Sequence, residues 1–319
     1  MSILIVTVAD DLHAEAIRHR LRTRFGADCS IVECDRVSHN ATINWCRENR
    51  GGRCVLGSKH GPVDMSECTA IWWRRARSTQ ADPSVAANDA YVDLVNNDCR
   101  AALFGSLLSM FGGAWISHPM ATDRAGNKLV QLRTASELGF RIPATLVTQA
   151  PERVGEFLAR HPQSIVKPVF GTPKELCYTQ YLSREHLKNT DGIRVSPAMY
   201  QEFIPGTRHV RLNCFGDRSF AAMIETDKLD WRANLNTKIT DWEVPSALHN
   251  SIRAVLDALE LKMGVVDLKL TPEGEPVWLE VNPQGQFLFL EGLTGRDYTE
   301  VFAEFLYSES LQAQCAIRT

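Results

Sequence analysis

Three oxygen-bearing side chains near the end of the chain, Asp267, Glu280 and Asn282, have the spacing of a metal site. Asp267 interrupts the apolar run 264–270, and Glu280 and Asn282 interrupt the run 277–283. Both runs predict strands, and side chains two residues apart on a strand point to one face. Two carboxylates and an amide oxygen suit Mg²⁺, which often takes phosphate oxygens as further ligands. The alternative is a hairpin whose polar residues face water.

Two lysines earlier in the chain add cationic groups to this set. Lys128 stands at the start of a predicted helix, and Lys167 follows Ile165 and Val166 on a short predicted strand. A lysine with a buried stem directs its ammonium at an anion or at water. Two lysines and a magnesium site are what a triphosphate needs, because they neutralise its oxygens and fix its position. The alternative for each lysine is a solvated side chain.

Four arginines stand where they could contact an anionic substrate. Arg74 and Arg75 directly follow the apolar strand 70–73, at the type of strand end where α/β folds bind ligands. Arg211 lies in a predicted hairpin, and Arg232 follows Asp230 and Trp231. The planar guanidinium binds carboxylate or phosphate through two parallel hydrogen bonds. The alternatives are a solvated charge run for Arg74 and Arg75 and a surface arginine for Arg211.

The elements that must position these residues follow from the apolar periodicity. A strand at 2–8, a helix at 10–25 and a strand at 29–34 predict a parallel sheet, so Trp72 and Trp73 alternate and one of them is expected in the core. We predict three parts, at residues 1–117, 118–205 and 206–319. The predicted elements that follow are a hairpin at 42–57, helices at 88–108, 127–138, 151–160, 246–261 and 296–309, strands at 142–148, 164–168, 176–182 and 198–204, and a hairpin at 209–225.

Composition excludes several classes of protein. The 319 residues carry a net charge of −3, which gives no basic surface for nucleic acid, and no apolar run reaches membrane-spanning length. The first residues lack the basic region of a signal peptide, and the nine cysteines are scattered without metal-site spacing. We therefore expect a cytoplasmic protein with reduced thiols and no nucleic-acid or membrane partner, and a homodimer because that is the commonest oligomer.

The order of these motifs resembles the ATP-grasp superfamily. The resemblance rests on Lys128, Lys167-Pro168, the segment 201–204, Asp267 and the segment 280–283. It implies an α/β and α+β fold in which an N-terminal α/β domain precedes central and C-terminal subdomains that clamp ATP. It also implies that the lysines contact the phosphates, that Asp267, Glu280 and Asn282 hold Mg²⁺, and that the remaining nucleotide contacts come from Gln201, Glu202, Phe203, Ile204 and His209. His209 stands where many of these enzymes have an acidic residue.

A narrower resemblance points to the microviridin-type, or graspetide, synthetases. It is carried by the segments 71–75, 229–232 and 280–287. It implies a ligase that activates Asp or Glu side chains of a ribosomal precursor peptide, with its leader and core, as acyl phosphates. A hydroxyl or amine of the same peptide then closes an ω-ester or ω-amide ring. The implied catalytic residues are Arg211 and Arg232, and the implied substrate-binding residues are Arg74, Arg75, Asp230, Trp231 and Gln284.

Two other functions remain open at this point. One is an ATP-dependent ligase that joins a free amino acid to a peptide or small acid. The other is a nucleotide-binding scaffold, which the intact metal set argues against. Two local features also depart from the family pattern or extend it: the phosphate-covering loop 170–173 has one glycine, and Asn234 and Asn236 are further candidates for metal or phosphate contact.

Overall fold

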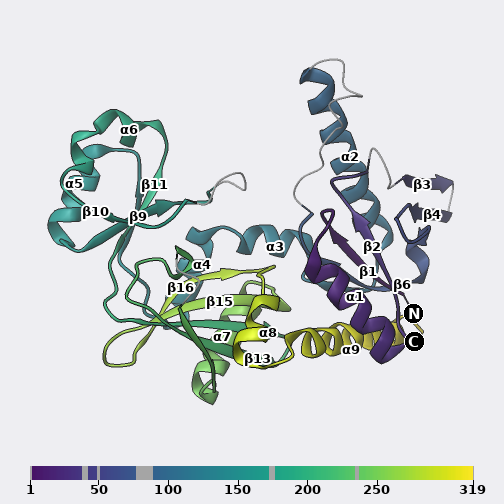
Figure 1. The fold of residues 1–319 in the computed structure, drawn as a ribbon. Helices are drawn as coiled ribbons and strands as arrows, with labels where there is room; N and C mark the ends of the chain where they lie inside the picture. The colour runs from purple at the N-terminus through teal and green to yellow at the C-terminus, as the bar shows by residue number, and fades with distance from the viewer. Residues whose placement is uncertain are drawn as a thin grey trace. The chain divides into compact units, whose positions relative to one another are not determined.

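The computed structural model describes residues 2–37, 42–48, 51–76, 89–171, 177–233 and 237–318. The chain forms two compact units, the first made of residues 1–120, 286–291 and 297–319 and the second of residues 121–285 and 292–296. Each unit contains helices and sheets (Figure 1). Asn234, Asn236 and residues 172–173 of the predicted loop lie outside the described residues.

The first unit is built on a parallel sheet with the strand order β2-β1-β6-β7. Every residue of β1 is buried, as expected for a parallel strand covered on both faces. Trp72 and Trp73 point to opposite faces of the sheet by alternation, and we expected one of them in the core. Both are buried, because both faces of the sheet are covered. The elements are β1 (Ser2–Thr7), α1 (Leu12–Phe25), β2 (Asp28–Glu33), β6 (Cys68–Trp73), α2 (Asp89–Met110) and β7 (Ala114–Ile116).

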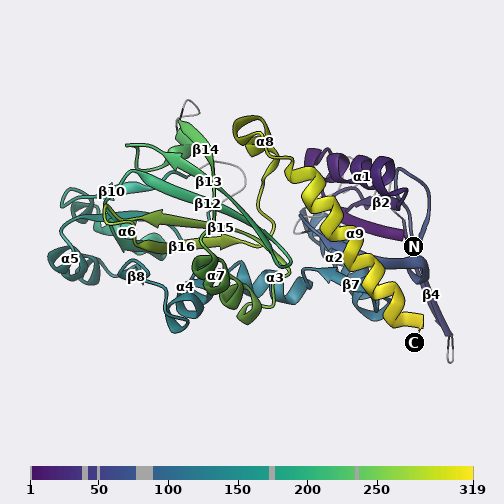
Figure 2. The same ribbon diagram turned by 90° about the horizontal axis from the view of Figure 1, so that it is seen from below.

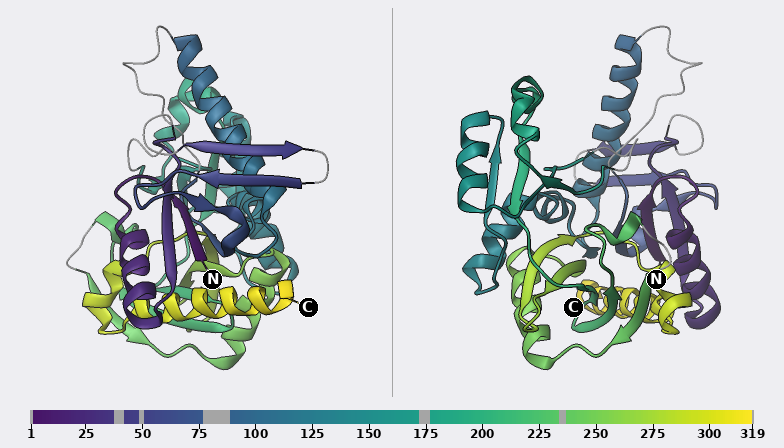
Figure 3. Two further views of the ribbon diagram at one scale, coloured as in Figure 1. Left: turned by 90° about the vertical axis from the view of Figure 1, so that its right-hand side faces the viewer. Right: turned by 60° about the vertical axis from the view of Figure 1, so that its left-hand side comes forward.

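A small antiparallel sheet is inserted between β2 and β6. It consists of β3 (Ile43–Glu48), β4 (Gly51–Leu56) and β5 (Val63–Asp64), followed by a 3₁₀ turn at Met65–Glu67. The pair β3–β4 extends as a two-stranded ribbon in the left view of Figure 3. The hairpin predicted at 42–57 is therefore present.

The last helix, α9 (Tyr298–Arg318), packs on the sheet of the first unit. Phe302 lies 4.5 Å from Trp72 between ring centroids, and Arg20 on α1 forms an ion pair with Glu300 at 2.5 Å. This grouping differs from the predicted part 206–319, because the apolar face of a helix does not reveal which sheet it covers. The boundaries after residues 117 and 205 remain predictions.

His13, at the start of α1, forms hydrogen bonds with the backbone at the start of α8 (Leu288–Thr294) within the first unit. Its Nε2 accepts hydrogen bonds from the backbone N–H groups of Phe287, at 3.0 Å, and Leu288, at 3.2 Å. An imidazole nitrogen that accepts must be unprotonated. Burial and the nearby Arg74 guanidinium lower the pKa of His13 to about 3, although Asp11 opposes this.

The second unit begins with a four-stranded antiparallel sheet in the order β10-β9-β11-β8. Helix α5 covers it, because Val154, Phe157 and Leu158 form one apolar stripe on the helix. The elements from the unit boundary onward are α3 (Pro119–Ala125), α4 (Lys128–Glu137), β8 (Thr145–Thr148), α5 (Pro151–Arg160), β9 (Ser164–Pro168), β10 (Gln180–Leu182), a 3₁₀ turn (His186–Lys188), α6 (Thr190–Val195) and β11 (Ala198–Glu202).

A five-stranded antiparallel sheet completes the second unit, in the order β14-β13-β12-β15-β16. One face packs its apolar residues against α4 and α7 (Figure 2), and the other face carries the polar residues described below. Strand β14 was not predicted from the sequence. The elements are β12 (Arg208–Phe215), β13 (Arg218–Glu225), a 3₁₀ turn (Trp231–Ala233), β14 (Lys238–Trp242), α7 (Ser246–Ala258), β15 (Met263–Leu270) and β16 (Pro276–Asn282).

None of the helices in the described ranges is long and apolar enough to cross a membrane.

Candidate functional site

A row of charged residues crosses three adjacent strands of the five-stranded sheet. Arg211 on β12 is paired with Asp267 on β15, and Asp267 is paired with Glu280 on β16. We name these three residues the charged row. They share the face opposite the apolar core, because Val210, Leu212, Val266 and Leu268 alternate with them and are buried in the core cluster. Asn282, two residues beyond Glu280, lies beside the row and is exposed.

Both carboxylates of the charged row form ion pairs. Arg211 donates through Nη1 to both carboxylate oxygens of Asp267, each at 2.9 Å. Lys128 Nζ lies 3.1 Å from Glu280 Oε2. The side chains of Asp267 and Glu280 are 21% and 32% exposed, so they are neither sealed in the core nor fully solvated. A ligand can therefore reach them.

Lys128 reaches Glu280 because two polar residues fix helix α4 against β16. Asn127 caps the helix by accepting the N–H of Leu129 at 2.9 Å, so Lys128 is the first helical residue. The buried Gln131 donates to the carbonyl of Val281 at 2.8 Å and accepts its N–H at 2.8 Å. Gln131 was not predicted from the sequence, since a single glutamine in an apolar helical stripe gives no signal of its partner.

Lys167 on β9 faces the same group of charges. Burial lowers the pKa of its ammonium to about 8, with Lys128 and Arg232 acting in the same direction and Glu280 and Asp267 opposing it. Burial raises the pKa of Asp267, partly offset by Arg211, whereas Lys128 and Lys167 outweigh burial and lower the pKa of Glu280. The two predicted lysines are therefore brought together with the predicted metal ligands.

Arg232 stands at the same cluster, held by a neighbouring acid. It donates through Nε to Asp230 Oδ1 at 2.8 Å and through Nη2 to Oδ2 at 2.6 Å, a bidentate pair. The guanidinium of Arg211 lies 6.0 Å from the ring centroid of Trp231, within cation–π range. Four cationic side chains thus face three carboxylates, and an anionic ligand would compensate the excess positive charge.

The chain turns back over the sheet directly after Asn282. Asn282 Oδ1 accepts the N–H of Gln284 at 3.0 Å, and the Asn282 carbonyl accepts the N–H of Gly285 at 3.2 Å. A Cβ atom on Gly285 would lie 2.4 Å from Val265 Cβ, so only glycine fits against β15 at this point. Gln284 is 9% exposed. The segment 283–285 therefore packs on the sheet beside the charged row.

The segment 201–204, which the ATP-grasp resemblance implies contacts the nucleotide, begins with the last two residues of β11, Gln201 and Glu202, and their side chains form contacts within the protein. Gln201 Nε2 donates to Thr145 Oγ1 at 2.9 Å, and Glu202 Oε2 accepts the N–H of Ala144 at 3.1 Å. Glu202 also donates its own N–H to the carbonyl of Ala144 at 2.9 Å, whereas Gln201 Oε1 has no hydrogen-bond partner among the described residues. Phe203 lies 5.0 Å from Lys269 Nζ, measured to its ring centroid, and Ile204 is buried.

His209, another implied nucleotide contact, lies on β12 and is buried. It is paired across the strands with Lys269, a residue that was not selected from the sequence. Burial lowers the pKa of His209 to about 4, with Lys269 acting in the same direction and Asp230 opposing it. Lys269 could have been found, because it stands two residues after Asp267 and so shares its face.

The structure places the predicted Arg74 and Arg75 in the first unit. Arg74 is 3% exposed, donates through Nε to Asp11 Oδ2 at 2.5 Å and lies 4.9 Å from the Trp72 ring centroid. It is therefore a buried ion pair and not part of a solvated charge run. Arg75 is exposed. A substrate contact from either arginine remains a prediction.

The donor set fits a metal that is shared with a phosphate ligand. Within the described residues, no group of three or more His, Cys, Asp or Glu side chains could hold a metal ion alone. Asp267, Glu280 and Asn282 supply only a few oxygens, which suits Mg²⁺ because this ion commonly completes its shell with water and substrate phosphates. A dedicated structural metal site would need more protein ligands.

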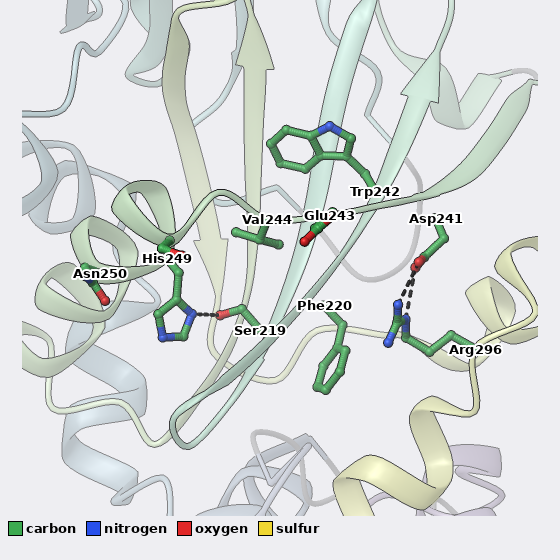
Figure 4. A pocket seen from close by; sticks show the side chains of 10 residues that line it. Ser219, Phe220, Asp241, Trp242, Glu243, Val244, His249, Asn250 and Arg296 are labelled. Carbon is green, nitrogen blue, oxygen red and sulfur yellow. Dashed lines mark hydrogen bonds and ion pairs between the residues drawn. The ribbon is translucent and has the colours of Figure 1, made fainter.

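A cavity of about 620 Å³ lies elsewhere in the second unit, at the junction of β13, β14 and α7 (Figure 4). Its polar groups largely satisfy each other: Arg296 binds Asp241 through two hydrogen bonds of 3.0 and 2.7 Å, and His249 Nδ1 lies 2.9 Å from Ser219 Oγ. No residue of the charged row lines this cavity, and we assign the cavity no part in the chemistry of the charged row.

Comparison with known proteins identifies the fold that carries this site. Residues 2–123 match the family model of the MvdD pre-ATP grasp domain. No curated protein matches the chain. The structure is similar to the macrocyclase MdnC bound with precursor peptide MdnA from Microcystis aeruginosa MRC, with 24% identity, a TM-score of 0.87 and coverage of 97% of this chain and 100% of that one.

Two further solved structures have the same fold. One is a RiPP-associated ATP-grasp ligase from Chryseobacterium gregarium in complex with ADP and a leader and core peptide (23% identity, TM-score 0.87, 97% of each chain). The other is the ATP-grasp ligase PsnB complexed with a phosphomimetic variant of minimal precursor, Mg and ADP (21% identity, TM-score 0.80, 97% of this chain and 99% of that one). The predicted fold class is confirmed: the chain has the ATP-grasp ligase fold, and its first part matches the MvdD pre-ATP grasp domain.

Proposed function

We propose that this protein is an ATP- and Mg²⁺-dependent ligase that closes rings in a ribosomally made precursor peptide. The observation that carries the proposal is the charged row with Lys128, Lys167 and Arg232 around it. This arrangement combines carboxylates for a metal with an excess of cations for phosphates. The solved relatives bound to precursor peptides support the choice of acceptor.

The proposed reaction has two steps that balance without a further reactant. A side-chain carboxylate oxygen of the peptide attacks the γ-phosphorus of ATP, and ADP leaves, which gives an acyl phosphate. A hydroxyl or amine of the same peptide then attacks the acyl carbon, phosphate leaves and one proton is released. The product is an ω-ester or ω-amide ring, and the peptide is lighter by one water for each ring.

The side chains of this chain would act by binding and by charge. Lys128 and Lys167 neutralise phosphate oxygens, and Asp267, Glu280 and Asn282 hold Mg²⁺, which would screen the phosphates when bound. Arg211 and Arg232 reduce the repulsion between the attacking carboxylate and the phosphate, because their guanidinium groups can neutralise both. Asp230 orients Arg232 through the bidentate pair. Substrate contacts from Arg75, Trp231 and Gln284 complete the proposal.

A glutamine substitution at Glu280 tests this function. Glu280→Gln keeps the size of the side chain and removes its charge, so we expect ADP release with the precursor peptide to fall by about 100- to 1000-fold, as for loss of one electrostatic group at a reacting centre. Glu243→Gln is the matched control, because Glu243 is exposed on the segment after β14. Both variants are assayed for ADP release and for peptide mass.

The peptide mass separates the competing functions. The test substrate is sought among the short open reading frames beside this gene, as a peptide whose core is rich in Thr, Ser or Lys and in Asp or Glu. Loss of one water per ring with ADP release supports the macrocyclase. A gain of one residue's mass from added amino acid would instead identify a ligase that extends peptides. If neither ADP nor modified peptide forms and Glu280→Gln retains the ability to bind a partner, the chain is a scaffold.

We further propose that the protein acts in the cytoplasm as a homodimer, without nucleic-acid or membrane partners. Burial raises the pKa of the thiols of Cys34 and Cys68 to about 12, so these cysteines stay protonated and unreactive. Such thiols agree with the reduced cysteines that we expect of a cytoplasmic protein.

The proposal of a homodimer rests on the frequency of twofold oligomers. Multi-angle light scattering of the purified protein measures this directly, and a monomeric mass would exclude it.

A further inference from the structure

Arg141, in the connection between α4 and β8, contacts both sheets of the second unit. Its Nη1 lies 2.7 Å from Glu275 Oε2, and its Nη2 lies 3.5 Å from Glu202 Oε1. Glu275 directly precedes β16 of the five-stranded sheet, and Glu202 is the last residue of β11 in the four-stranded sheet. One guanidinium group therefore bridges the two sheets. The reaction steps described above do not use Arg141.

The backbone of Arg141 is held on the five-stranded sheet. Its carbonyl accepts the N–H of Trp278 at 2.9 Å, next to an isolated parallel bridge with Val277 on β16. The ring of the preceding residue, Phe140, packs edge to face on Trp278 at 5.3 Å between centroids. Arg141 is therefore fixed to β16, and its side chain extends from this strand to Glu202.

Each of the two acids is fixed to its own part of the chain. Glu202 forms two hydrogen bonds with Ala144: its Oε2 accepts the N–H at 3.1 Å, and its own N–H donates to the carbonyl at 2.9 Å. Glu275 closes the turn between β15 and β16, because its carbonyl accepts the N–H of Thr271 at 3.0 Å and its N–H donates to Thr271 Oγ1 at 3.2 Å. A shift of one sheet against the other therefore has to change the geometry at Arg141.

The two sheets carry different parts of the candidate site. Lys167 lies on β9 opposite Met199 of β11, and Glu202 is three residues further along β11, which is about 10 Å at 3.3 Å per residue. The charged row lies on the five-stranded sheet, where Glu280 is five residues after Glu275. With a lever arm of about 10 Å, a tilt of about 6° between the sheets would move Lys167 by about 1 Å. The bridge thus controls a distance on which the site depends.

We propose that Arg141 is a positioning residue that sets the spacing between Lys167 and the charged row. This assignment rests on the proposed function, in which the lysine and the metal ligands contact the same triphosphate. Exposed ion pairs contribute little to stability, and the side chains of Arg141 and Glu275 are 38% and 52% exposed. The role of the bridge therefore lies in the geometry of the site more than in the stability of the fold.

Substitution of Arg141 should weaken the binding of ATP. Arg141→Met keeps a long side chain but removes the cation that lies between Glu202 and Glu275. Lys167 and the metal ligands are then no longer held where both contact the phosphates. We expect the affinity for ATP with Mg²⁺ to fall about 10-fold, the lower end of the range for one lost hydrogen bond to a charged group. Arg141→Lys keeps the cation and should restore part of this affinity.

The experiment is calorimetric titration of ATP, with Mg²⁺ present, into the unmodified protein and its variants. Glu275→Gln should weaken binding by a similar factor, and the double variant with Arg141→Met should bind no more weakly than Arg141→Met alone, because both substitutions remove the same bridge. The control is Arg133→Met, which breaks an ion pair of 2.8 Å with Glu137 inside α4, where Arg133 is 79% exposed. Melting temperatures are measured in parallel and should differ by no more than a few degrees.

The possible failures of this proposal and of the proposed function are distinguishable. If Arg141→Met and Glu275→Gln bind ATP as tightly as Arg133→Met, Arg141 has no positioning role, and a lowered melting temperature in the same variants would make the bridge purely structural. Effects of the two substitutions that multiply in the double variant would overturn the bridge, because they would come from independent contacts. If the unmodified protein binds no ATP, the proposed function itself is wrong.

Discussion

Substitution of Gly285 by alanine tests whether the segment after the metal strand is held tightly on the sheet. The added Cβ would lie 2.4 Å from both Cβ and Cγ2 of Val265. Cβ atoms in proteins essentially never have contacts shorter than 3.0 Å. Val265 is fully buried in β15, so its side chain has no free space into which it could move. Ordinary carbon contacts of about 3.5–4.0 Å therefore require the segment 283–285 to move by about 1 to 1.5 Å.

We expect this displacement to reduce the rate more than the stability. Gly285 follows Asn282 by three residues, so the movement is transmitted to a proposed metal ligand and to Gln284. A misplacement of about 1 Å at a reacting group can cost on the order of 100-fold in rate. Overpacking of this kind costs about 1–3 kcal/mol of folding free energy. The assay is the kcat for ADP release with precursor peptide, together with the melting temperature.

Two further variants make the test specific. Gly155→Ala is the control, because nothing lies within 4 Å of a Cβ at that helical position and alanine favours a helix. Val265→Gly removes the atoms that collide with the added methyl group, so the double variant should be less impaired than the two single variants predict together. If Gly285→Ala retains the kcat and melting temperature of Gly155→Ala, the close packing of this segment on β15 is refuted.

Two other predictions concern buried polar contacts. Gln131→Leu leaves the N–H and carbonyl of Val281 without their partners, and we expect a loss of about 1–3 kcal/mol in unfolding free energy, measured by urea denaturation, and a raised KM for ATP; an unchanged KM would show that α4 does not need Gln131 to position Lys128. His13 binds fewer protons folded, with a pKa of about 3, than unfolded, near 6.5. Its contribution is therefore complete above about pH 6.5 and decreases as the pH falls toward 3. His13→Gln should show a smaller drop in melting temperature between about pH 7 and pH 5, and an equal drop would contradict the role of Nε2 as acceptor.

Much of the candidate site was predictable because strand periodicity is local. Alternation with apolar neighbours was enough to place Asp267 on one face, and the two-residue spacing put Glu280 and Asn282 together. The pairing of Asp267 with Glu280, in contrast, depends on a β-bulge, because the register next to the turn would place Asp267 opposite Leu279. The ordered lysines and the acids also identified the ATP-grasp fold, which comparison with solved structures confirms.

Other features depend on contacts that no local pattern encodes. Gln131 and Val281 are 150 residues apart, and their two hydrogen bonds could not be inferred from either segment. Helix α9 covers the first sheet although the predicted grouping placed it with the last strands. The burial of Arg74 with Asp11 likewise excludes, for Arg74, the alternative of a solvated charge run.

The sequence alone predicted which residues could bind a metal and a triphosphate, and it indicated which of them share a strand face, because the geometry of a single strand is set by its own backbone. Only the tertiary structure decided which cations reach which carboxylates, that Gly285 must lie against Val265, and that His209 is paired across the strands with Lys269. These depend on strand register and helix docking, which arise when distant segments bury their apolar faces together.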